Sequence, residues 1–299
     1  MAKQPRILAG KVIAITGGAR GIGRETARLC VNDGMKVAIG DVDPQAGQEA
    51  AAELGPNVAA FALDVTDPAS FRAFLTAVDE RFGSLDVLVN NAGIMPIGPF
   101  LEESDATAQR ILDINVHGVI NGMKAALPGM LARGHGHVLN IASQAGKYGL
   151  PGGATYCASK AAVLNLSRAV RKEIRKSGVD ISVISPVAVN TELGLGLGEP
   201  RVPMFRKVEP NHVAEAIVST IREPEFDVHV PKSMKVSERM LAVLPINTQD
   251  NLSRLTGGDY ALSHIDAGAR TDYELRAARS EPSLAAAPEQ GQLSGPNDS

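Results

Sequence analysis

The chain has no tryptophan, and only two cysteines and six histidines among its 299 residues. Cys30 and Cys157 lie far apart, in segments with helical periodicity, so we expect reduced thiols rather than a disulfide framework. The scattered histidines and cysteines match no spacing of zinc ligands. The sequence therefore predicts no metal site.

Long hydrophobic runs and a strong net charge are also lacking. No apolar run reaches the roughly 20 residues that a membrane-spanning helix needs. Residues 1–10 are too short and too polar for a signal peptide. The formal net charge is -3, which gives no indication of binding to nucleic acid or to an anionic membrane. We expect a soluble cytoplasmic protein with no nucleic-acid partner and no transmembrane segment.

Short apolar runs alternate with helical patterns through most of the chain. The apolar runs are continuous rather than alternating with polar residues, as in strands whose sheet is covered on both faces. This predicts an α/β fold with a doubly wound, mostly parallel sheet of about seven strands and helices on both faces. Ligands of such sheets bind beyond the carboxyl ends of the strands. The expected strands are 11–16, 36–40, 58–63, 85–90, 137–142, 179–185 and 226–230, and the expected helices are 21–33, 44–54, 68–82, 104–131, 154–176 and 211–222.

Three later stretches depart from this rhythm. Residues 193–203 alternate Gly with Leu and then turn to Pro, which predicts a mobile loop that covers a site. Residues 234–255 are weakly amphipathic, and a charged run follows to residue 279. The last stretch is rich in Ala, Pro, Ser, Gly and Gln, a composition typical of disorder. We predict a main domain at 8–232, a C-terminal helical extension at 233–279 and a disordered tail at 280–299.

A glycine-rich turn follows the first strand and leads directly into a helix. Gly17, Gly21 and Gly23 let the backbone turn sharply and approach a pyrophosphate, to which the helix offers free N–H groups and its positive end. The spacing is G-x-x-x-G-x-G rather than the common dinucleotide fingerprint G-x-G-x-x-G. Glycines at such a place can also serve the turn alone, so the motif by itself leaves both interpretations open.

Asp41 ends the second strand about twenty residues beyond this turn, where a ribose would lie. A carboxylate there accepts hydrogen bonds from the 2′- and 3′-hydroxyls of NAD and repels the 2′-phosphate of NADP. The alternatives are that Asp41 caps the helix that begins near Pro44, and that Arg20 in the turn favours a phosphate. Because Asp41 sits where the ribose edge should be, we predict NAD as the cofactor.

Tyr156 and Lys160 are four residues apart in a helical segment, so their side chains share one face. A tyrosine pKa near 10 is too high for a general base at neutral pH. A nearby ammonium and a positive nicotinamide ring favour the phenolate and lower that pKa. Lys160 is also long enough to reach the hydroxyls of the nicotinamide ribose. On an arbitrary helix such a pair is usually a surface contact, so further residues have to support this role.

Two polar residues supply that support. Ser143 follows the fifth strand, where its hydroxyl is able to hold a substrate oxygen as a carbonyl becomes an alkoxide, or the reverse. Asn115 lies inside a helical pattern, where Asn is a mediocre choice, and if buried it needs hydrogen-bond partners. Those partners are either a water chain to Lys160 or the protein backbone.

Taken together, these residues resemble the short-chain dehydrogenase/reductase family in its compact single-domain form, over residues 11–230. The resemblance implies that Tyr156 is the acid/base, that Lys160 lowers its pKa and binds ribose, that Ser143 fixes the substrate oxygen, and that Asn115 supports a proton relay. It further implies a Rossmann-like NAD-binding catalytic domain and a homodimer or homotetramer assembled through the two long helices. The matching residues, in the order of the family, are Thr16, Gly17, Gly21, Ile22, Gly23, Asn90, Asn91, Ala92, Gly93, Asn115, Ser143, Tyr156 and Lys160.

The resemblance also assigns the cofactor contacts. Asp64 and Val65 flank the adenine, and Val189 and Thr191 hold the nicotinamide carboxamide. The family usually has glycine after Pro186, whereas this chain has Val187, which cannot readily adopt the backbone angles of glycine. We therefore expect a differently shaped loop there. The predicted cofactor-binding residues are Gly17, Arg20, Gly21, Ile22, Gly23, Asp41, Asp64, Val65, Asn91, Ala92, Gly93, Tyr156, Lys160, Pro186, Val189 and Thr191.

The predicted substrate cleft is largely apolar, with no Arg or Lys placed for a carboxylate or phosphate. This favours a lipophilic alcohol or ketone, and the C-terminal extension looks similar to that of family members acting on sterols, retinoids or long-chain alcohols. The extension has three possible roles: to fold over the cleft, to support the oligomer or to rest on a membrane surface. We expect Ser143, Tyr156, Gln144 and Met95 to contact the substrate, in a cleft lined by Ile94, Met95, Pro96, Gln144, Leu150 and residues 193–197.

Three other functions are alternatives to this one. Extended members of the superfamily that act on nucleotide sugars carry T-G-x-x-G-x-x-G and a larger substrate domain, neither of which is evident. The residues for zinc-dependent alcohol dehydrogenation are lacking. A non-catalytic nicotinamide-binding sensor or scaffold remains the alternative to the predicted NAD-dependent oxidoreductase, which transfers a hydride between NAD(H) and a secondary or primary alcohol or ketone.

Overall fold

Every strand pair in the sheet is parallel, in the order β3-β2-β1-β4-β5-β6-β7. The computed structural model describes residues 4–198, 206–241 and 243–256, and the single residues 266, 268, 270, 273 and 277. The order reverses at β1, which lies between β2 and β4, so the crevice for ligands is expected beyond these strands. The strands are β1 (Val12–Thr16), β2 (Lys36–Asp41), β3 (Val58–Ala62), β4 (Val87–Asn90), β5 (Gly136–Ile141), β6 (Val179–Pro186) and β7 (Asp227–Val230).

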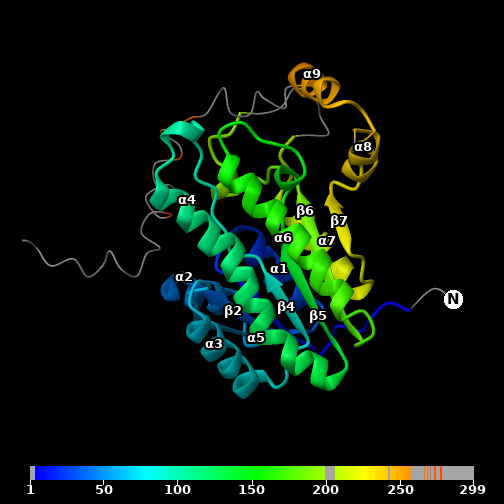
Figure 1. The fold of residues 1–299 in the computed structure, drawn as a ribbon. Helices are drawn as coiled ribbons and strands as arrows, with labels where there is room; N and C mark the ends of the chain where they lie inside the picture. The colour runs from blue at the N-terminus through cyan, green and yellow to red at the C-terminus, as the bar shows by residue number, and fades with distance from the viewer. Residues whose placement is uncertain are drawn as a thin grey trace, which may run out of the picture.

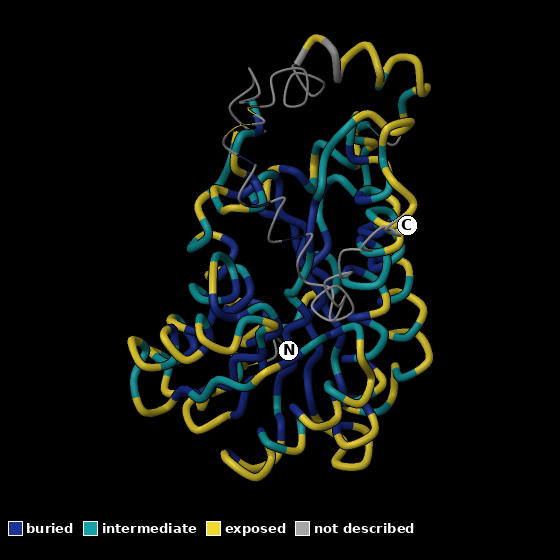
Figure 2. Tube along the Cα trace, turned by 90° about the vertical axis from the view of Figure 1, so that its left-hand side faces the viewer, coloured by how far each residue is buried: buried dark blue, intermediate teal, exposed yellow. Residues whose placement is uncertain are grey.

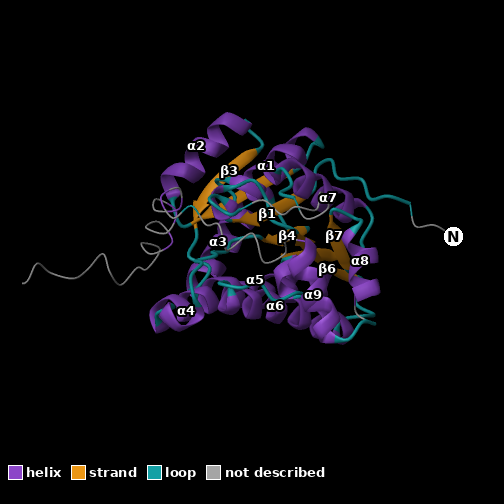
Figure 3. Cartoon of the chain, turned by 90° about the horizontal axis from the view of Figure 1, so that it is seen from above, coloured by secondary structure: helices purple, strands orange, loops and turns teal. Residues whose placement is uncertain are grey.

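Helices cover both faces of this sheet, as Figure 3 shows from above. One face carries α1, α2 and α7, and the other carries α3, α5 and α6. Two further helices, α8 and α9, lie at the top of Figure 1, beyond β6 and β7. The helices are α1 (Gly21–Asn32), α2 (Pro44–Leu54), α3 (Pro68–Phe82), α4 (Asp105–Leu112), α5 (Gly118–Arg133), α6 (Ala154–Glu173), α7 (Pro210–Arg222), α8 (Met234–Leu241) and α9 (Ile246–Thr256), with short 3-10 turns η1 (Phe100–Glu102), η3 (Gln144–Gly146) and η4 (Glu192–Gly194).

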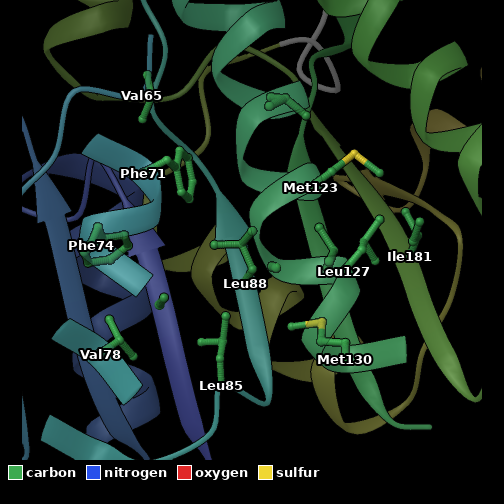
Figure 4. Packing of buried hydrophobic residues seen from close by; sticks show 14 of the residues in the cluster. Val65, Phe71, Phe74, Val78, Leu85, Leu88, Met123, Leu127, Met130 and Ile181 are labelled. Atoms are coloured by element: carbon green, nitrogen blue, oxygen red, sulfur yellow. The ribbon is translucent and has the colours of Figure 1, made fainter. Parts of the chain in front are cut away.

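Two apolar cores sandwich the sheet. Phe71 and Phe74 of α3 meet edge to face, with ring centroids 6.2 Å apart, and pack with Leu88 of β4 and Met130 of α5 (Figure 4). On the opposite face, strand residues pack against α1 and α7. Burial of each such side chain contributes about 1.5–3 kcal/mol. Figure 2 shows the buried residues along the sheet and the exposed ones on the outer helix faces. The predicted α/β, doubly wound fold is confirmed.

The prediction of one continuous helix at 104–131 is wrong in one respect. Between α4 and α5 the chain forms a π-helical turn, η2 (Asp113–His117). This wider turn contains Asn115, whose fully buried side chain bonds both main-chain polar groups of Ile94. Insertions of this kind are rare in helices and frequently lie at functional sites.

Some of the remaining sequence predictions concern residues that the structure describes, and others lie outside them. The amphipathic stretch 234–255 corresponds to α8 and α9. Of the expected loop 193–203, residues 193–198 are described, with Leu197 buried, and 199–203 lie outside the described residues. The tail 280–299 also lies outside them. Both cysteines are free, as predicted. No helix in the described ranges combines the length and apolar character needed to cross a membrane.

Candidate active site

The loops after β1 and β4 are joined at the point where the strand order reverses. The hydroxyl of Thr16 accepts hydrogen bonds from the main-chain N–H groups of Asn91 and Ala92, both at 3.0 Å. The side-chain amide of Asn91 donates to the carbonyls of Thr16 at 2.9 Å and Gly17 at 3.0 Å. Because each loop satisfies the polar groups of the other, the two form one rigid edge.

The glycine turn lies on this edge and needs glycine for conformation and for space. Gly17 and Gly21 have φ angles of +62° and +53°, a region that side chains strongly disfavour. A Cβ at Gly23 would overlap the carbonyl oxygen of Gly17. Arg20 occupies the N-cap of α1 without a capping hydrogen bond from its side chain. The turn and the start of α1 therefore fit an anionic group such as a pyrophosphate.

Two neighbouring aspartates at the end of β2 have separate tasks. Asp41 accepts hydrogen bonds from the N–H of Ala19 at 3.0 Å and of Asp43 at 3.1 Å. Asp43 is the N-cap of α2, accepts from Ala46 N–H at 3.0 Å and pairs with Arg20 at 2.8 Å. These two bonds, first that of Ala46, lower the pKa of Asp43. The alternative that Asp41 caps α2 is therefore wrong.

Tyr156, Lys160 and Ser143 converge where β5 ends and α6 begins. Both α6 side chains are buried, each 5% exposed. The Lys160 ammonium donates to the carbonyl of Ile141 at 3.0 Å and lies 5.8 Å from the centre of the Tyr156 ring. Ser143 hydrogen-bonds to the Tyr156 hydroxyl and, at the start of η3, accepts from Ala145 N–H at 3.1 Å.

The electrostatics of this trio are dominated by burial. Burial raises the pKa of Tyr156 to about 12, against the opposing effect of the Ser143 hydrogen bond. Burial lowers the pKa of Lys160 to about 8. In the protein by itself the tyrosine pKa thus shifts upward, opposite to the expected direction, because desolvation of the phenolate outweighs the stabilising hydrogen bond from Ser143.

Asn115 lies behind this trio and is fully buried. Its side-chain oxygen accepts from Ile94 N–H at 2.9 Å, and its nitrogen donates to Ile94 O at 2.9 Å and to the Ser159 hydroxyl at 3.0 Å. Ser159 in turn donates to the carbonyl of Tyr156 at 2.7 Å. The protein itself therefore satisfies the Asn115 amide, mainly through backbone groups, as one of the two sequence alternatives proposed.

A cavity of about 970 Å³ joins the glycine turn to the Ser143–Tyr156–Lys160 group. Several predicted residues do not line this cavity. Gly23 is buried in α1, Asp41 ends β2, and Asp64 and Val65 follow β3. Ile94, Pro96 and Asn115 do not line it either. The predicted residues that line the cavity are Gly17, Arg20, Gly21, Ile22, Asn91, Ala92, Gly93, Met95, Ser143, Gln144, Leu150, Tyr156, Lys160, Pro186, Val189, Thr191, Leu193, Gly194 and Leu197.

The surroundings of Gln144 and Val187 differ from what the sequence predicted. The amide nitrogen of Gln144 is bonded to Ser185 O at 2.8 Å and His229 Nδ1 at 3.0 Å, so this end of the side chain serves the sheet rather than a substrate. Val187 donates its N–H to Val230 O at 2.9 Å and so extends the pairing of β6 with β7. No non-glycine residue of the described chain has a positive φ. Valine is therefore accommodated at position 187 without a positive φ.

Sequence reasoning missed a buried charged cluster beside the cavity. The Lys147 side chain is 4% exposed, and its ammonium contacts both oxygens of Asp227 at 2.9 Å, Glu238 at 3.0 Å and His229 at 3.2 Å. Burial opposes ionisation of Asp227, but its bonds to His229 and Lys147 outweigh this and lower its pKa to about 2. The cluster ties α8 to β7 and to the turn that follows Ser143.

The wall contributed by the C-terminal half was also only partly foreseen. The amphipathic pattern pointed to α8 and α9, whereas nothing in the charged run that follows indicated Tyr273. The wall residues absent from the predicted cleft include Tyr148, Met234, Leu241, Leu244, Ile246 and Tyr273.

Comparison with known proteins gives a consistent result. The family model described as short chain dehydrogenase matches residues 11–200. The chain is 41% identical over 186 residues to sorbitol dehydrogenase of Cereibacter sphaeroides, covering 62% of this chain and 73% of that protein. It is 37% identical over 213 residues to 3-alpha-(or 20-beta)-hydroxysteroid dehydrogenase of Mycobacterium bovis, covering 71% and 82%.

A solved structure agrees with these relatives. A short chain dehydrogenase/reductase from Burkholderia phymatum in complex with NAD superposes with a TM-score of 0.71 and 28% sequence identity, covering 78% of this chain and 93% of the other. The residues that the family model matches, 11–200, include the glycine turn and the Ser143–Tyr156–Lys160 group. The chain belongs to the short-chain dehydrogenase family.

Proposed function

We propose that this protein is an NAD-dependent oxidoreductase that transfers a hydride between NAD(H) and a secondary or primary alcohol or ketone. One observation carries the proposal: a single cavity is lined by the glycine turn at one end and by Ser143, Tyr156 and Lys160 at the other. A cofactor and a substrate that both enter this cavity meet at the Tyr156 hydroxyl. The dehydrogenase names of the relatives and the NAD complex of the structural relative support the same activity.

The residues present fit NAD. The uncapped start of α1 and the turn from Gly17 to Gly21 suit the pyrophosphate, and Asp41 is placed to accept from the adenosine ribose. Arg20, the cation that would attract a 2′-phosphate, is paired with Asp43. The further contacts in the proposal are Ile22 and Gly23 in α1, Asp64 and Val65 at the adenine, Asn91, Ala92 and Gly93 beneath the cofactor, and Pro186, Val189 and Thr191 at the carboxamide.

When bound, NAD supplies the acceptor for the hydride that leaves the carbinol carbon with its bonding electrons. The Tyr156 phenolate takes the hydroxyl proton, so the alcohol becomes a carbonyl compound and one proton is released. Ser143 holds the substrate oxygen, and the Lys160 ammonium favours the phenolate. Asn115 hydrogen-bonds to Ile94 and Ser159 beside this group. The proposal also includes a role for Asn115 in supporting a proton relay.

The substrate class we propose is lipophilic, with hydroxysteroids, retinol or long-chain alcohols as models. The substrate end of the cavity has mostly apolar walls, formed by Met95, Tyr148, Leu150, Leu193, Met234 and Leu244. The proposal also includes the catalytic domain at 8–232, a cytoplasmic location and a homodimer or homotetramer formed through the long helices.

The test is NADH formation from NAD with sterol, retinoid, aliphatic, aromatic and sugar alcohols, with Tyr156→Phe as the matched variant. We expect turnover with lipophilic alcohols that is lost in the variant, while NADH binding, measured by fluorescence, is retained. A preference for sorbitol would overturn the lipophilic class. Tight NADH binding without turnover of any alcohol would overturn the enzyme and favour the nicotinamide-binding sensor.

A further inference from the structure

Arg270, far along the chain from the sheet, is 2% exposed and binds three main-chain carbonyl groups. Its guanidinium donates to Leu193 O at 3.1 Å, to Leu195 O at 2.8 Å and to Met95 O at 2.8 Å. Met95 belongs to the loop after β4, whereas Leu193 and Leu195 belong to the loop after β6. One side chain therefore joins the two loops that carry the Met95 and Leu193 walls of the cavity.

Tyr273 reinforces this connection and reaches the cavity itself. Its hydroxyl oxygen accepts from Met95 N–H at 2.7 Å, and the Arg270 guanidinium lies 5.0 Å from the centre of its ring. The ring packs with Ile94 and Ile111 in a small apolar cluster and forms part of the cavity wall. Tyr273 thus contributes both a hydrogen bond to the loop and an apolar surface to the site.

The loop after β6 also contacts the main chain near Arg270. Gly196 has a φ of +70°, and a Cβ there would lie 2.7 Å from Asp266 O and 2.9 Å from Arg270 Cγ. Its carbonyl accepts from Asp266 N–H at 2.9 Å. At the far end, Arg110 of α4 donates to Ala277 O at 3.0 Å. The main-chain N–H of Asp266 and the main-chain carbonyl of Ala277 are therefore each held by a specific contact.

The energetics indicate a site that depends on Arg270. A guanidinium taken out of water is costly unless its donors are satisfied, and here three carbonyls on two loops accept from three of its N–H groups. Truncation of Arg270 leaves those carbonyls without this donor and releases one loop from the other. The direct contacts described for Arg270 and Tyr273 involve neither the glycine turn nor Asp41.

We propose that Arg270 and Tyr273 are positioning and specificity-determining residues for the substrate, an inference that rests on the proposed function. Arg270 sets the separation of the two loops, and the Tyr273 ring closes the apolar wall between them. Together they shape the substrate end of the cavity for a bulky apolar alcohol such as a hydroxysteroid, while the cofactor end is formed without them.

The experiment compares KM and kcat for a 3α-hydroxysteroid and for 2-propanol in the full-length protein. We expect Arg270→Met and Tyr273→Ala to raise the steroid KM about tenfold or more, with kcat changed less than about threefold. The KM for 2-propanol and the affinity for NADH stay the same. Tyr273→Phe, which keeps the ring and loses the hydroxyl, gives a smaller rise, and Arg270→Lys restores part of the loss. Arg28→Met, a change at an exposed surface pair on α1, serves as the control.

Each outcome decides a separate question. Equal effects on steroid and 2-propanol, or a parallel loss of NADH affinity, would identify general structural damage and overturn the inference. Unchanged kinetics in folded Arg270→Met and Tyr273→Ala would overturn it as well. Absence of turnover in the wild-type protein would instead overturn the proposed function, and this inference with it.

Discussion

The carboxylate of Asp41 accepts a hydrogen bond from the main-chain N–H of Ala19 at 3.0 Å, which ties the end of β2 to the glycine turn. Helix capping is left to Asp43, so Asp41 is held at the edge where we place the adenosine ribose. The same carboxylate is therefore both a brace for the turn and the negative charge that a 2′-phosphate would meet.

Asp41→Ala is expected to lower the preference for NAD over NADP about tenfold or more, equivalent to about 1.4 kcal/mol. The reason is the loss of an acceptor for the ribose hydroxyls together with the loss of repulsion toward the 2′-phosphate. The measurement is kcat/KM with each cofactor at a fixed alcohol concentration. Asp67→Ala removes a comparable carboxylate that caps α3 and leaves the ratio unchanged. An unaltered ratio in Asp41→Ala would remove the assignment.

Alcohol oxidation is expected to accelerate as the pH rises. Burial raises the pKa of Tyr156 to about 12, so below that value the fraction of phenolate increases up to tenfold per pH unit. Burial also lowers the pKa of Lys160 to about 8, so its ammonium is lost as the pH rises through that value and the increase becomes less steep. Lys160→Met should slow oxidation and remove this break. The measurement is kcat/KM against pH in both proteins, and a flat wild-type profile would contradict Tyr156 as the base.

The sequence predicted the position of the proposed site because its parts stand at the ends of parallel strands. Ser143, Asn91 and Asp41 each follow a continuous apolar run, and in a parallel sheet those ends gather at one edge. The apolar pattern did not distinguish a π turn at Asn115 from continuous helix, because both bury similar side chains. The orientation of Gln144 depends on His229, 85 residues away. Arg270 binds main-chain carbonyls. Because every residue has such a carbonyl, no sequence pattern indicates these partners.

Lys147→Met is expected to destabilise the fold and loosen α8. The variant leaves Asp227, Glu238 and His229 close together without the ammonium that separates them. Removal of one partner of a buried ion pair costs about 3–5 kcal/mol, and we expect roughly 2 kcal/mol because the carboxylates are partly exposed. The measurement is urea unfolding of both proteins. Lys235→Met breaks the exposed pair with Glu225 and should change stability by less than about 1 kcal/mol. Equal losses of unfolding free energy in the two variants would show that the buried cluster stabilises the fold no more than the exposed pair does.

His137 gives the fold a dependence on pH that is separate from catalysis. The side chain is fully buried in β5, and its Nε2 lies 2.8 Å from the Ser182 hydroxyl. Burial, followed by the charge of Arg6, lowers the pKa of His137 to about 3. Since the unfolded chain has a histidine pKa near 6.5, between these values the unfolded state binds a proton that the folded state does not. The contribution of the neutral His137 to stability is therefore fully present above about pH 6.5 and is lost as the pH is lowered toward 3.

His137→Gln, which keeps an amide near Ser182 but does not titrate, should remove one proton from this dependence. The free energy of unfolding, measured with urea between pH 6 and 4.5, is expected to fall less steeply in the variant, by about 1.4 kcal/mol per pH unit. His135→Gln is the control, because the His135 side chain is 57% exposed and its substitution leaves the slope as in the wild type. If His137→Gln kept the wild-type slope, the buried imidazole would have to be charged in the folded protein, and its solvation beside Ser182 would need a different account.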